Sequence, residues 1–316
     1  IVSGNTAVTN GAGVFGTSAG VTSLNSTLDH NSVGGGRGGG VYALSTLLDL
    51  ETTTFEWNSG ASLGGGAYVE GTSGSNEVTT VTFRSNTAVS GGGVYLTAVP
   101  VFKFDGTSVT SNTATGGFGG GVAVRASSHA TFSGSRVDSN IAPASGGGID
   151  VESATVTVEL GSVVEDNTAT TASTSLGGGI AGVSSTVTVD ASTVQSNTAH
   201  LHGGGLYMVE TTHSLLSGAQ VLNNVVVYDG DVDGAGGGVY SQDSEFTYTS
   251  SSVSTNSARL GSGLYVSGED GTPRITSSTL LLNGVSTTDD GGGAYFTGTV
   301  TAAVVEQSFV TSNTAG

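Results

Sequence analysis

Ser85–Leu96 reads SNTAVSGGGVYL, and variants of this stretch recur from one end of the 316-residue chain to the other. Each variant contains one asparagine followed, some residues later, by a glycine triplet. A period of this length predicts a solenoid or a propeller, in which each repeat is one stacked unit. The asparagine returns at intervals of 26 to 32 residues, as Asn5, Asn31, Asn58, Asn86, Asn112, Asn140, Asn167, Asn197, Asn224, Asn256, Asn283 and Asn313. Eleven triplets end at Gly13 (as GAG), Gly40, Gly66, Gly93, Gly121, Gly148, Gly179, Gly205, Gly238, Gly263 (as GSG) and Gly293.

The two parts of the period differ in how far their length changes. The last glycine of a triplet always precedes the next asparagine by 18 to 20 residues, whereas the asparagine precedes the next last glycine by 7 to 14. A constant arc with one variable turn indicates stacked strands with a loop at one corner. A propeller blade needs about 40 residues and four strands, and this unit has room for three short strands. We therefore predict an all-β, right-handed parallel β-helix of about 11 coils of 25–33 residues, forming one continuous domain over residues 1–316.

Two columns of apolar residues indicate the inside of the coil. One apolar residue directly follows each triplet, and another stands three positions before each asparagine. Alternation with polar residues around them is the pattern of strands with one buried face. We expect both columns to form the core, and the asparagine amides to bond from coil to coil at one turn. The first column is Val14, Val41, Ala67, Val94, Val122, Ile149, Ile180, Leu206, Val239, Leu264 and Ala294. The second is Val2, Leu28, Phe55, Phe83, Val109, Val137, Val164, Val194, Val221, Val253, Leu280 and Val310.

The amino-acid composition restricts which binding partners and which cellular location we expect for this chain. Seven basic residues stand against 25 acidic ones, and the net charge of −18 disfavours nucleic acid and anionic membranes as partners. The chain has no cysteine, which excludes disulfides and thiolate zinc sites. The sequence contains no run of 18 apolar residues, so we expect no direct insertion into a membrane. The abundance of Ser, Thr, Asn and Gly and the single lysine favour an extracellular or cell-surface location.

Two motifs suggest a family. Phe-x-x-Asn stands at Phe55–Asn58 and Phe83–Asn86, and Gly-Gly-Ala at Gly65–Ala67 and Gly292–Ala294. Once-per-coil pairing of these motifs resembles the β-helix repeats of the chlamydial polymorphic outer membrane proteins and of related bacterial and algal surface proteins. In most coils Val or Leu replaces Phe and Gly replaces Ala. The resemblance covers the whole chain and implies the β-helical passenger of an adhesin, although it informs about fold more than function.

Seven of the nine tyrosines share one position, the second residue after the triplet. They form either a stack that stiffens the sheet beneath the variable loops or an exposed strip that binds sugar rings or a protein. Three successive coils carry Ala123, Asp150 and Ala181 there, which predicts a shallow gap about 14 Å tall with Asp150 at its middle. The predicted binding face comprises Tyr42, Tyr68, Tyr95, Asp150, Tyr207, Tyr240, Tyr265 and Tyr295.

A second candidate site lies in the longest variable turn. Asp229, Asp231 and Asp233 alternate and precede Gly234, as in the first half of a calcium loop. Tyr240 stands where such a loop has its bidentate Glu, so a plain acidic loop is the alternative. The same edge carries further possible ligands in neighbouring coils, namely His200, His202, Asp289 and Asp290. We predict calcium at the three aspartates as the one possible cofactor.

An enzyme is the alternative to a binding protein. Many parallel β-helices cleave acidic polysaccharides, either as lyases with acidic calcium clusters or as hydrolases with Asn-Thr-Asp, Asp-Asp, Gly-His-Gly and Arg-Ile-Lys motifs. Here only Asp289-Asp290 matches, while His202 stands in LHGGG and Arg274 in RIT. Six arginines and one lysine spread over eleven coils indicate no cationic cleft. We therefore expect no catalytic residues.

The expected function is an extracellular adhesin or a structural filament protein with a non-catalytic binding face. The chain opens at Val2 and closes at Val310 in the same phase of the repeat, with no polar cap at either end. Uncovered terminal coils invite association, so we expect further repeats in a longer polypeptide or copies stacked end to end. The expected partner is a protein or glycan on a surface, or another copy of the chain.

Overall fold

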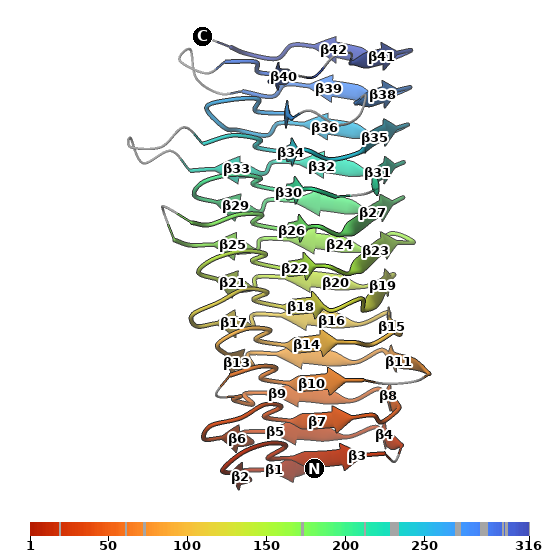
Figure 1. The fold of residues 1–316 in the computed structure, drawn as a ribbon, viewed down its shortest axis with the longest axis vertical. Coiled ribbons are helices and arrows are strands. Elements are labelled where there is room, and N and C mark those ends of the chain that lie inside the picture. The colour runs from red at the N-terminus through yellow and green to blue at the C-terminus, as the bar shows by residue number, and fades with distance from the viewer. Residues whose placement is uncertain are drawn as a thin grey trace.

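The chain winds into a rod of stacked coils whose strands all run parallel to their neighbours in the next coil (Figure 1). The computed structural model describes residues 1–18, 20–60, 62–71, 74–171, 174–211, 213–227, 234–268, 273–284, 290–298, 300 and 303–315. The two ends of the chain lie at opposite ends of the rod. No helix in the described ranges is long and apolar enough to cross a membrane.

Three long sheets form the walls of the rod in the described part of the chain. Sheet 1 contains β1 (Val2–Ser3), β5 (Thr27–Asp29), β9 (Thr54–Glu56), β12 (Thr82–Arg84), β16 (Ser108–Thr110), β20 (Arg136–Asp138), β24 (Val163–Glu165), β28 (Thr193–Gln195), β32 (Gln220–Leu222), β36 (Ser252–Ser254), β39 (Thr279–Leu281) and β42 (Phe309–Thr311). Sheet 2 contains β3 (Val14–Thr17), β7 (Val41–Leu44), β10 (Ala67–Glu70), β14 (Val94–Thr97), β18 (Val122–Arg125), β22 (Ile149–Glu152), β26 (Ile180–Val183), β30 (Leu206–Val209), β34 (Val239–Gln242), β37 (Leu264–Ser267) and β40 (Ala294–Thr297). Sheet 3 contains β4 (Val21–Leu24), β8 (Leu48–Glu51), β11 (Ser75–Thr79), β15 (Val101–Asp105), β19 (His129–Ser133), β23 (Thr155–Glu159), β27 (Thr186–Asp190), β31 (His213–Ser217), β35 (Phe246–Thr249), β38 (Arg274–Thr276) and β41 (Val304–Glu306).

A fourth, narrow sheet follows the ladder asparagines, where the sequence predicted only a turn. Its strands are two residues long because the chain extends briefly to place a small side chain inside the corner: Ala88, Ala114 and Ala142 are buried there. Sheet 4 contains β13 (Thr87–Ala88), β17 (Thr113–Ala114), β21 (Ile141–Ala142), β25 (Thr168–Ala169), β29 (Thr198–Ala199) and β33 (Val225–Val226), and β2 (Thr6–Ala7) pairs with β6 (Ser32–Val33) on the same wall.

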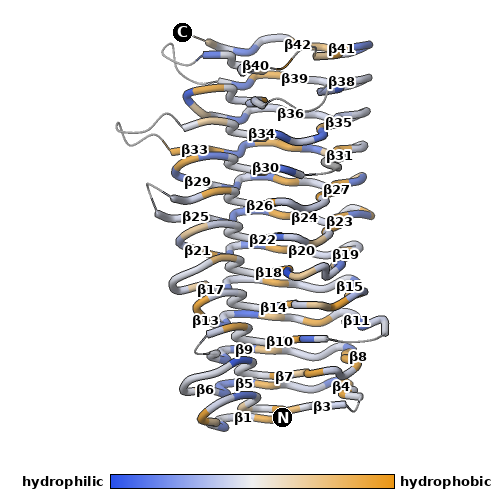
Figure 2. Tube along the Cα trace, in the orientation of Figure 1, coloured by the Kyte–Doolittle hydropathy of each residue, from blue (hydrophilic) through white to orange (hydrophobic). Residues whose placement is uncertain are grey.

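The core is a continuous apolar axis, as the two apolar columns predict. Both columns are fully buried through the middle of the rod, and in Figure 2 apolar segments recur at matching positions in successive coils. Strand register keeps each column in line, since Val94 pairs with Ala67 on one side and Val122 on the other. Only in the outermost coils are column members exposed, as at Val310. The inward orientation of both columns is therefore confirmed.

The asparagines form a hydrogen-bonded ladder. Nδ2 of Asn140 donates to Oδ1 of Asn167 at 2.9 Å and to the carbonyl oxygen of Val109 at 2.9 Å. Oδ1 of Asn140 accepts from Nδ2 and from the backbone N–H of Asn112, at 3.0 and 2.9 Å. All four hydrogen-bonding positions of the amide are thus filled inside the rod. The same Nδ2–Oδ1 bond joins every consecutive pair from Asn5 to Asn313.

Each glycine of a triplet has its own reason to lack a side chain, as one triplet illustrates. Gly146 has φ +57°, a left-handed conformation that favours glycine. A Cβ on Gly147 would lie 2.5 Å from the carbonyl oxygen of Gly178, and one on Gly148 would lie 2.9 Å from the amide of Asn167. The triplet therefore lets the backbones of neighbouring coils, and the ladder amides, approach one another.

Candidate functional site

The aromatic side chains two residues after the triplets stack along sheet 2, and we call this set the aromatic column. Parallel pairing places them in register, as in Tyr68 opposite Tyr42 and Tyr95. One stack runs from Phe15 through Tyr42 and Tyr68 to Tyr95, with ring centroids 5.1, 5.2 and 5.5 Å apart. The other runs through Tyr207, Tyr240, Tyr265 and Tyr295, with centroids 5.1, 4.9 and 5.5 Å apart. The predicted column thus exists as two separate stacks.

The column is not an exposed strip. Tyr42, Tyr68 and Tyr240 are 6%, 1% and 7% exposed, so for these rings the predicted exposure is wrong, while Tyr95 and Tyr207 are half-buried. Burial raises the pKa of Tyr240 to about 12 and also raises the pKa of Tyr68. Both phenols therefore stay neutral and act as packing groups with a polar tip. The geometry agrees with the stiffening stack, the other interpretation of the sequence.

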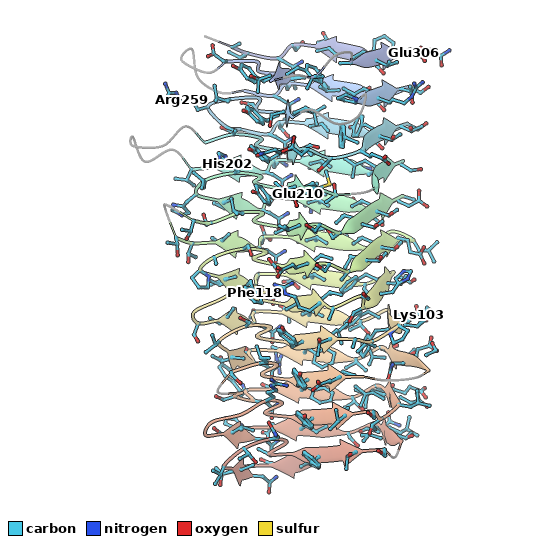
Figure 3. All side chains as sticks on the ribbon, viewed as in Figure 1. Lys103, Phe118, His202, Glu210, Arg259 and Glu306 are labelled. Atoms are coloured by element: carbon cyan, nitrogen blue, oxygen red, sulfur yellow. The ribbon has the colours of Figure 1, made fainter. Side chains whose placement is uncertain are left out.

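A second column consists of the residue directly before each triplet, and some of its side chains pack on tyrosine rings of the aromatic column. We call this second column the pre-triplet column, and backbone bridges join Leu176 to Ser145 and to His202 along it. The left-handed glycine that follows turns the chain back, and side chains of this column reach sheet 2 in several coils. The guanidinium carbon of Arg37 lies 4.9 Å from the ring centroid of Tyr68, and Nη1 of Arg37 donates to the Tyr68 hydroxyl at 2.7 Å. His202, labelled in Figure 3, stacks on Tyr240 with centroids 4.5 Å apart.

The predicted gap at Ala123, Asp150 and Ala181 is filled. Arg125, the last residue of β18, extends over it and forms an ion pair with the carboxylate of Asp150, with 10% and 7% of the two side chains exposed. The hydroxyl of Ser145 donates to the other carboxylate oxygen. Ala123 and Ala181 are buried, so no open surface remains between the two stacks. The prediction of a shallow gap is wrong, because Arg125 and Asp150 form a buried pair there.

The ion pair has an apolar lid and a third charged partner. The guanidinium carbon of Arg125 lies 4.0 Å from the ring centroid of Phe118, a pre-triplet residue labelled in Figure 3. Arg125 Nε is also 3.3 Å from Oε2 of Glu152, which is mostly exposed. Burial raises the pKa of Asp150, and the charge of Arg125 and the hydrogen bond from Ser145 oppose this shift. The charges of Arg125 and Asp150 are therefore compensated locally, and their ion pair joins two neighbouring coils.

Sequence reasoning missed Arg125, Phe118 and Ser145. For Phe118 and Ser145 the signal was the regular spacing of the pre-triplet column, whose members stand five residues before the aromatic column, as Ser145 does before Asp150. That spacing alone gives no reason to fold one column over the other. The left-handed turn at Gly146 supplies that reason.

The predicted calcium ligands cannot be placed. Asp229, Asp231, Asp233 and Asp289 lie outside the described residues, so calcium stays a prediction. Asp290 is described and bridges to Leu260 in the pre-triplet column. Of the other possible ligands, His202 packs on rings, and its Nδ1 is buried without a hydrogen-bond partner among the described residues. Within these ranges, no three His, Asp or Glu side chains gather in a way that could hold a metal ion.

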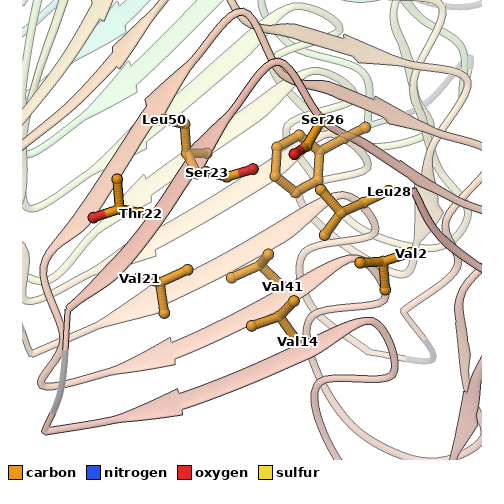
Figure 4. Close-up of a pocket in the computed structure, with 10 residues that line it drawn as sticks. Val2, Val14, Val21, Thr22, Ser23, Ser26, Leu28, Val41 and Leu50 are labelled. Atoms are coloured by element: carbon orange, nitrogen blue, oxygen red, sulfur yellow. The ribbon is translucent and has the colours of Figure 1, made fainter.

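A cavity of about 220 Å³ lies at the N-terminal end of the rod (Figure 4). Val2, Val14 and Val21, from three different sheets, point into it, together with Leu28 and Val41. Its ten lining residues include no ionisable side chain. The cavity is the apolar interior of the first coils and offers no group for acid–base chemistry.

Comparison with known families settles the fold. The sequence matches the family model described as "Right handed beta helix region" over residues 13–226 and over residues 106–310. The chain belongs to this right-handed β-helix family. The match confirms the predicted fold class, and the likeness to polymorphic outer membrane proteins stays a resemblance. No curated protein and no solved structure matches the chain significantly.

The Arg125–Asp150 pair should matter far more to this β-helix than its surface ion pairs. Arg125→Ala leaves a buried carboxylate unpaired and should lower the free energy of unfolding by about 3–5 kcal/mol. Arg125→Met combined with Asp150→Leu removes both charges and should recover most of that loss. Urea unfolding followed by circular dichroism measures both variants. As control, Lys103→Ala removes an exposed pair with Glu77 and should cost about 1 kcal/mol or less. Equal losses in the Arg125→Ala and Lys103→Ala proteins would contradict this assignment.

His202 should make the β-helix acid-sensitive. Burial lowers the pKa of His202 to about 4, from an ordinary value of 6.5. The unfolded chain therefore takes up this proton first, so stability present above pH 6.5 is lost as the pH falls from 6.5 to about 4. His202→Gln should abolish this part of the pH dependence, about 1–3 kcal/mol after solvent screening, in unfolding experiments at a series of pH values. His129→Gln, at an exposed position, is the matched control. A parent and a His202→Gln protein with parallel pH profiles would show that this imidazole is not responsible.

Proposed function

We propose that this chain is a non-catalytic, extracellular or cell-surface β-helix that acts as an adhesin element or as a building element of a surface filament. The observation that carries the proposal is that two buried ionisable groups with shifted pKa values serve as packing groups. Asp150 is bound by Arg125 and Ser145, and His202 packs against the rings of Tyr207 and Tyr240. Neither group is free to transfer a proton to a substrate held on the surface.

The basic residues support binding rather than cleavage of acidic glycans. Six of the seven lie 3.9 Å or less from a carboxylate oxygen, as Arg84 does from Glu56 and Arg136 from Asp138. An anionic sugar would have to displace these internal partners. A β-helix fold is compatible with adhesins and with glycan-cleaving enzymes alike, and the pairing of its cations favours the first.

The surface also suits an extended, soluble rod. Outward positions of sheet 3 carry hydroxyl and acidic side chains such as Thr157, Thr188 and Glu77. A net charge of −18 keeps such rods apart laterally, which leaves their ends and their corners as places for contact. A partner is then a protein or glycan on another surface, or a further copy of the chain.

Two assays test the proposed function together. Beads coated with the folded chain should accumulate on cell surfaces more than beads coated with heat-unfolded chain. Polygalacturonate and alginate incubated with the chain, with and without added calcium, should keep their length in size-exclusion chromatography. Shortened polysaccharide would contradict the non-catalytic assignment, and equal retention of folded and unfolded coatings would contradict the adhesive one.

A further inference from the structure

The residue directly before each ladder asparagine occupies a corner of the coil, between sheet 1 and sheet 4. The backbone there is left-handed in every coil, with φ between 51° and 67°. Glycine and small polar residues suit this conformation, and a bulky residue in it is unusual. Serine is the commonest choice at this corner. The twelve residues are Gly4, His30, Trp57, Ser85, Ser111, Ser139, Asp166, Ser196, Asn223, Thr255, Leu282 and Ser312.

Two adjacent coils place aromatic rings at this corner. Trp57 is 54% exposed and the side chain of His30 is 64% exposed, so neither ring is there to fill the core. Their ring centroids lie 6.4 Å apart with an interplanar angle of 28°, so the two rings stack on one another as one exposed aromatic pair. Trp57 is the single tryptophan of the chain. The fold requires the left-handed backbone here, but it does not require large rings.

Charged groups border these rings on sheet 1. Asp29, Glu56 and Arg84 stand in register on β5, β9 and β12. The indole Nε1 of Trp57 donates to Glu56 Oε1 at 2.8 Å, and Arg84 Nη2 donates to Glu56 Oε2 at 2.6 Å. His30 Nδ1 lies 3.1 Å from Asp29 Oδ2. Each ring is therefore held by its edge, and more than half of each side chain stays exposed to solvent.

The border supplies both acceptors and donors. The hydrogen bond from Arg84 lowers the pKa of Glu56, and the hydrogen bonds from Ser3 and His30 lower the pKa of Asp29, so both carboxylates are ionised acceptors. Arg84 is half-exposed and has further N–H groups to donate. Two carboxylates and one guanidinium stand side by side here, so charges of both signs border the rings. The corner therefore has no single sign of charge to attract a highly charged ligand.

We propose that the corner of His30 and Trp57 is a carbohydrate-binding site for a neutral sugar. A pyranose ring has an apolar C–H face, which suits an aromatic platform, and a rim of hydroxyls that both donate and accept. Oδ2 of Asp29 and the two oxygens of Glu56 accept from such hydroxyls through the lone pairs that His30, Trp57 and Arg84 leave, and Arg84 donates to them. This inference rests on the proposed adhesive function, for which it names the ligand class.

The tryptophan provides a direct test. Cellopentaose, laminaripentaose and chitopentaose are titrated into the folded chain while the emission of Trp57 is recorded. At least one of them should change the emission in a saturable way. Isothermal calorimetry then compares variants, and Trp57→Ser should weaken binding about tenfold or more. Serine is native to this corner in other coils, so the variant should fold, and unchanged circular dichroism and melting temperature check that it does.

Leu282→Ser is the matched control, because Leu282 is exposed at the same corner of a distant coil. It should bind the sugar as the parent does. Unchanged sugar affinity in Trp57→Ser, or no sugar response in the parent, would overturn the proposal, as would an emission change with an acidic or basic peptide alone. Adhesion of coated beads separates the two claims: if the Trp57→Ser coating adheres like the parent, the sugar site does not carry the adhesion and the adhesive function stands. If neither coating adheres, the function fails as well.

Discussion

The chain of asparagine amides from Asn5 to Asn313 is the interaction on which the rest of this structure depends. Each interior amide makes four hydrogen bonds, two to neighbouring amides, one to a carbonyl oxygen and one from a backbone N–H. A buried amide that lost these partners would be strongly unfavourable, so the ladder fixes both the height and the rotation of each coil. Glycine triplets are the complement of the ladder, because a Cβ on Gly148 would meet Asn167.

Because the coils stack in register, equivalent side chains form columns. A different residue at one position of a column is then compensated by a side chain of a neighbouring coil. The aromatic column is interrupted at Asp150, and the structure compensates with an arginine from the preceding coil and a hydroxyl from the same one. Such a unit stabilises the rod less than rings would, but it resists any slip between β18 and β22 because a slip would separate buried charges. The pre-triplet column performs the same covering role elsewhere through Arg37 and His202.

Most of the fold could be predicted from the sequence, because a solenoid repeats its local rules. Val94 had to face inward and Asn86 had to join a ladder, since each has a counterpart in every coil. The burial of Tyr68 and the closure of the predicted gap at Asp150 could not be predicted, because they depend on which residue folds back across the column. Alternation in strands says which face a side chain takes and nothing about what covers that face. Trp57 carries no signal in the sequence for a related reason: its motif is defined by Phe55 and Asn58, and its left-handed backbone is visible only in the structure.

Asparagine-to-alanine replacement at the centre of the ladder tests this account most directly. Asn140→Ala removes four hydrogen bonds and leaves the buried N–H groups of Asn112 without an acceptor, so calorimetric or urea unfolding should show a loss of about 3 kcal/mol or more. Asn5→Ala, at an exposed position of the same ladder, should lose about 1 kcal/mol or less. Similar, small losses at both positions would contradict the claim that the amide ladder holds the coils in place.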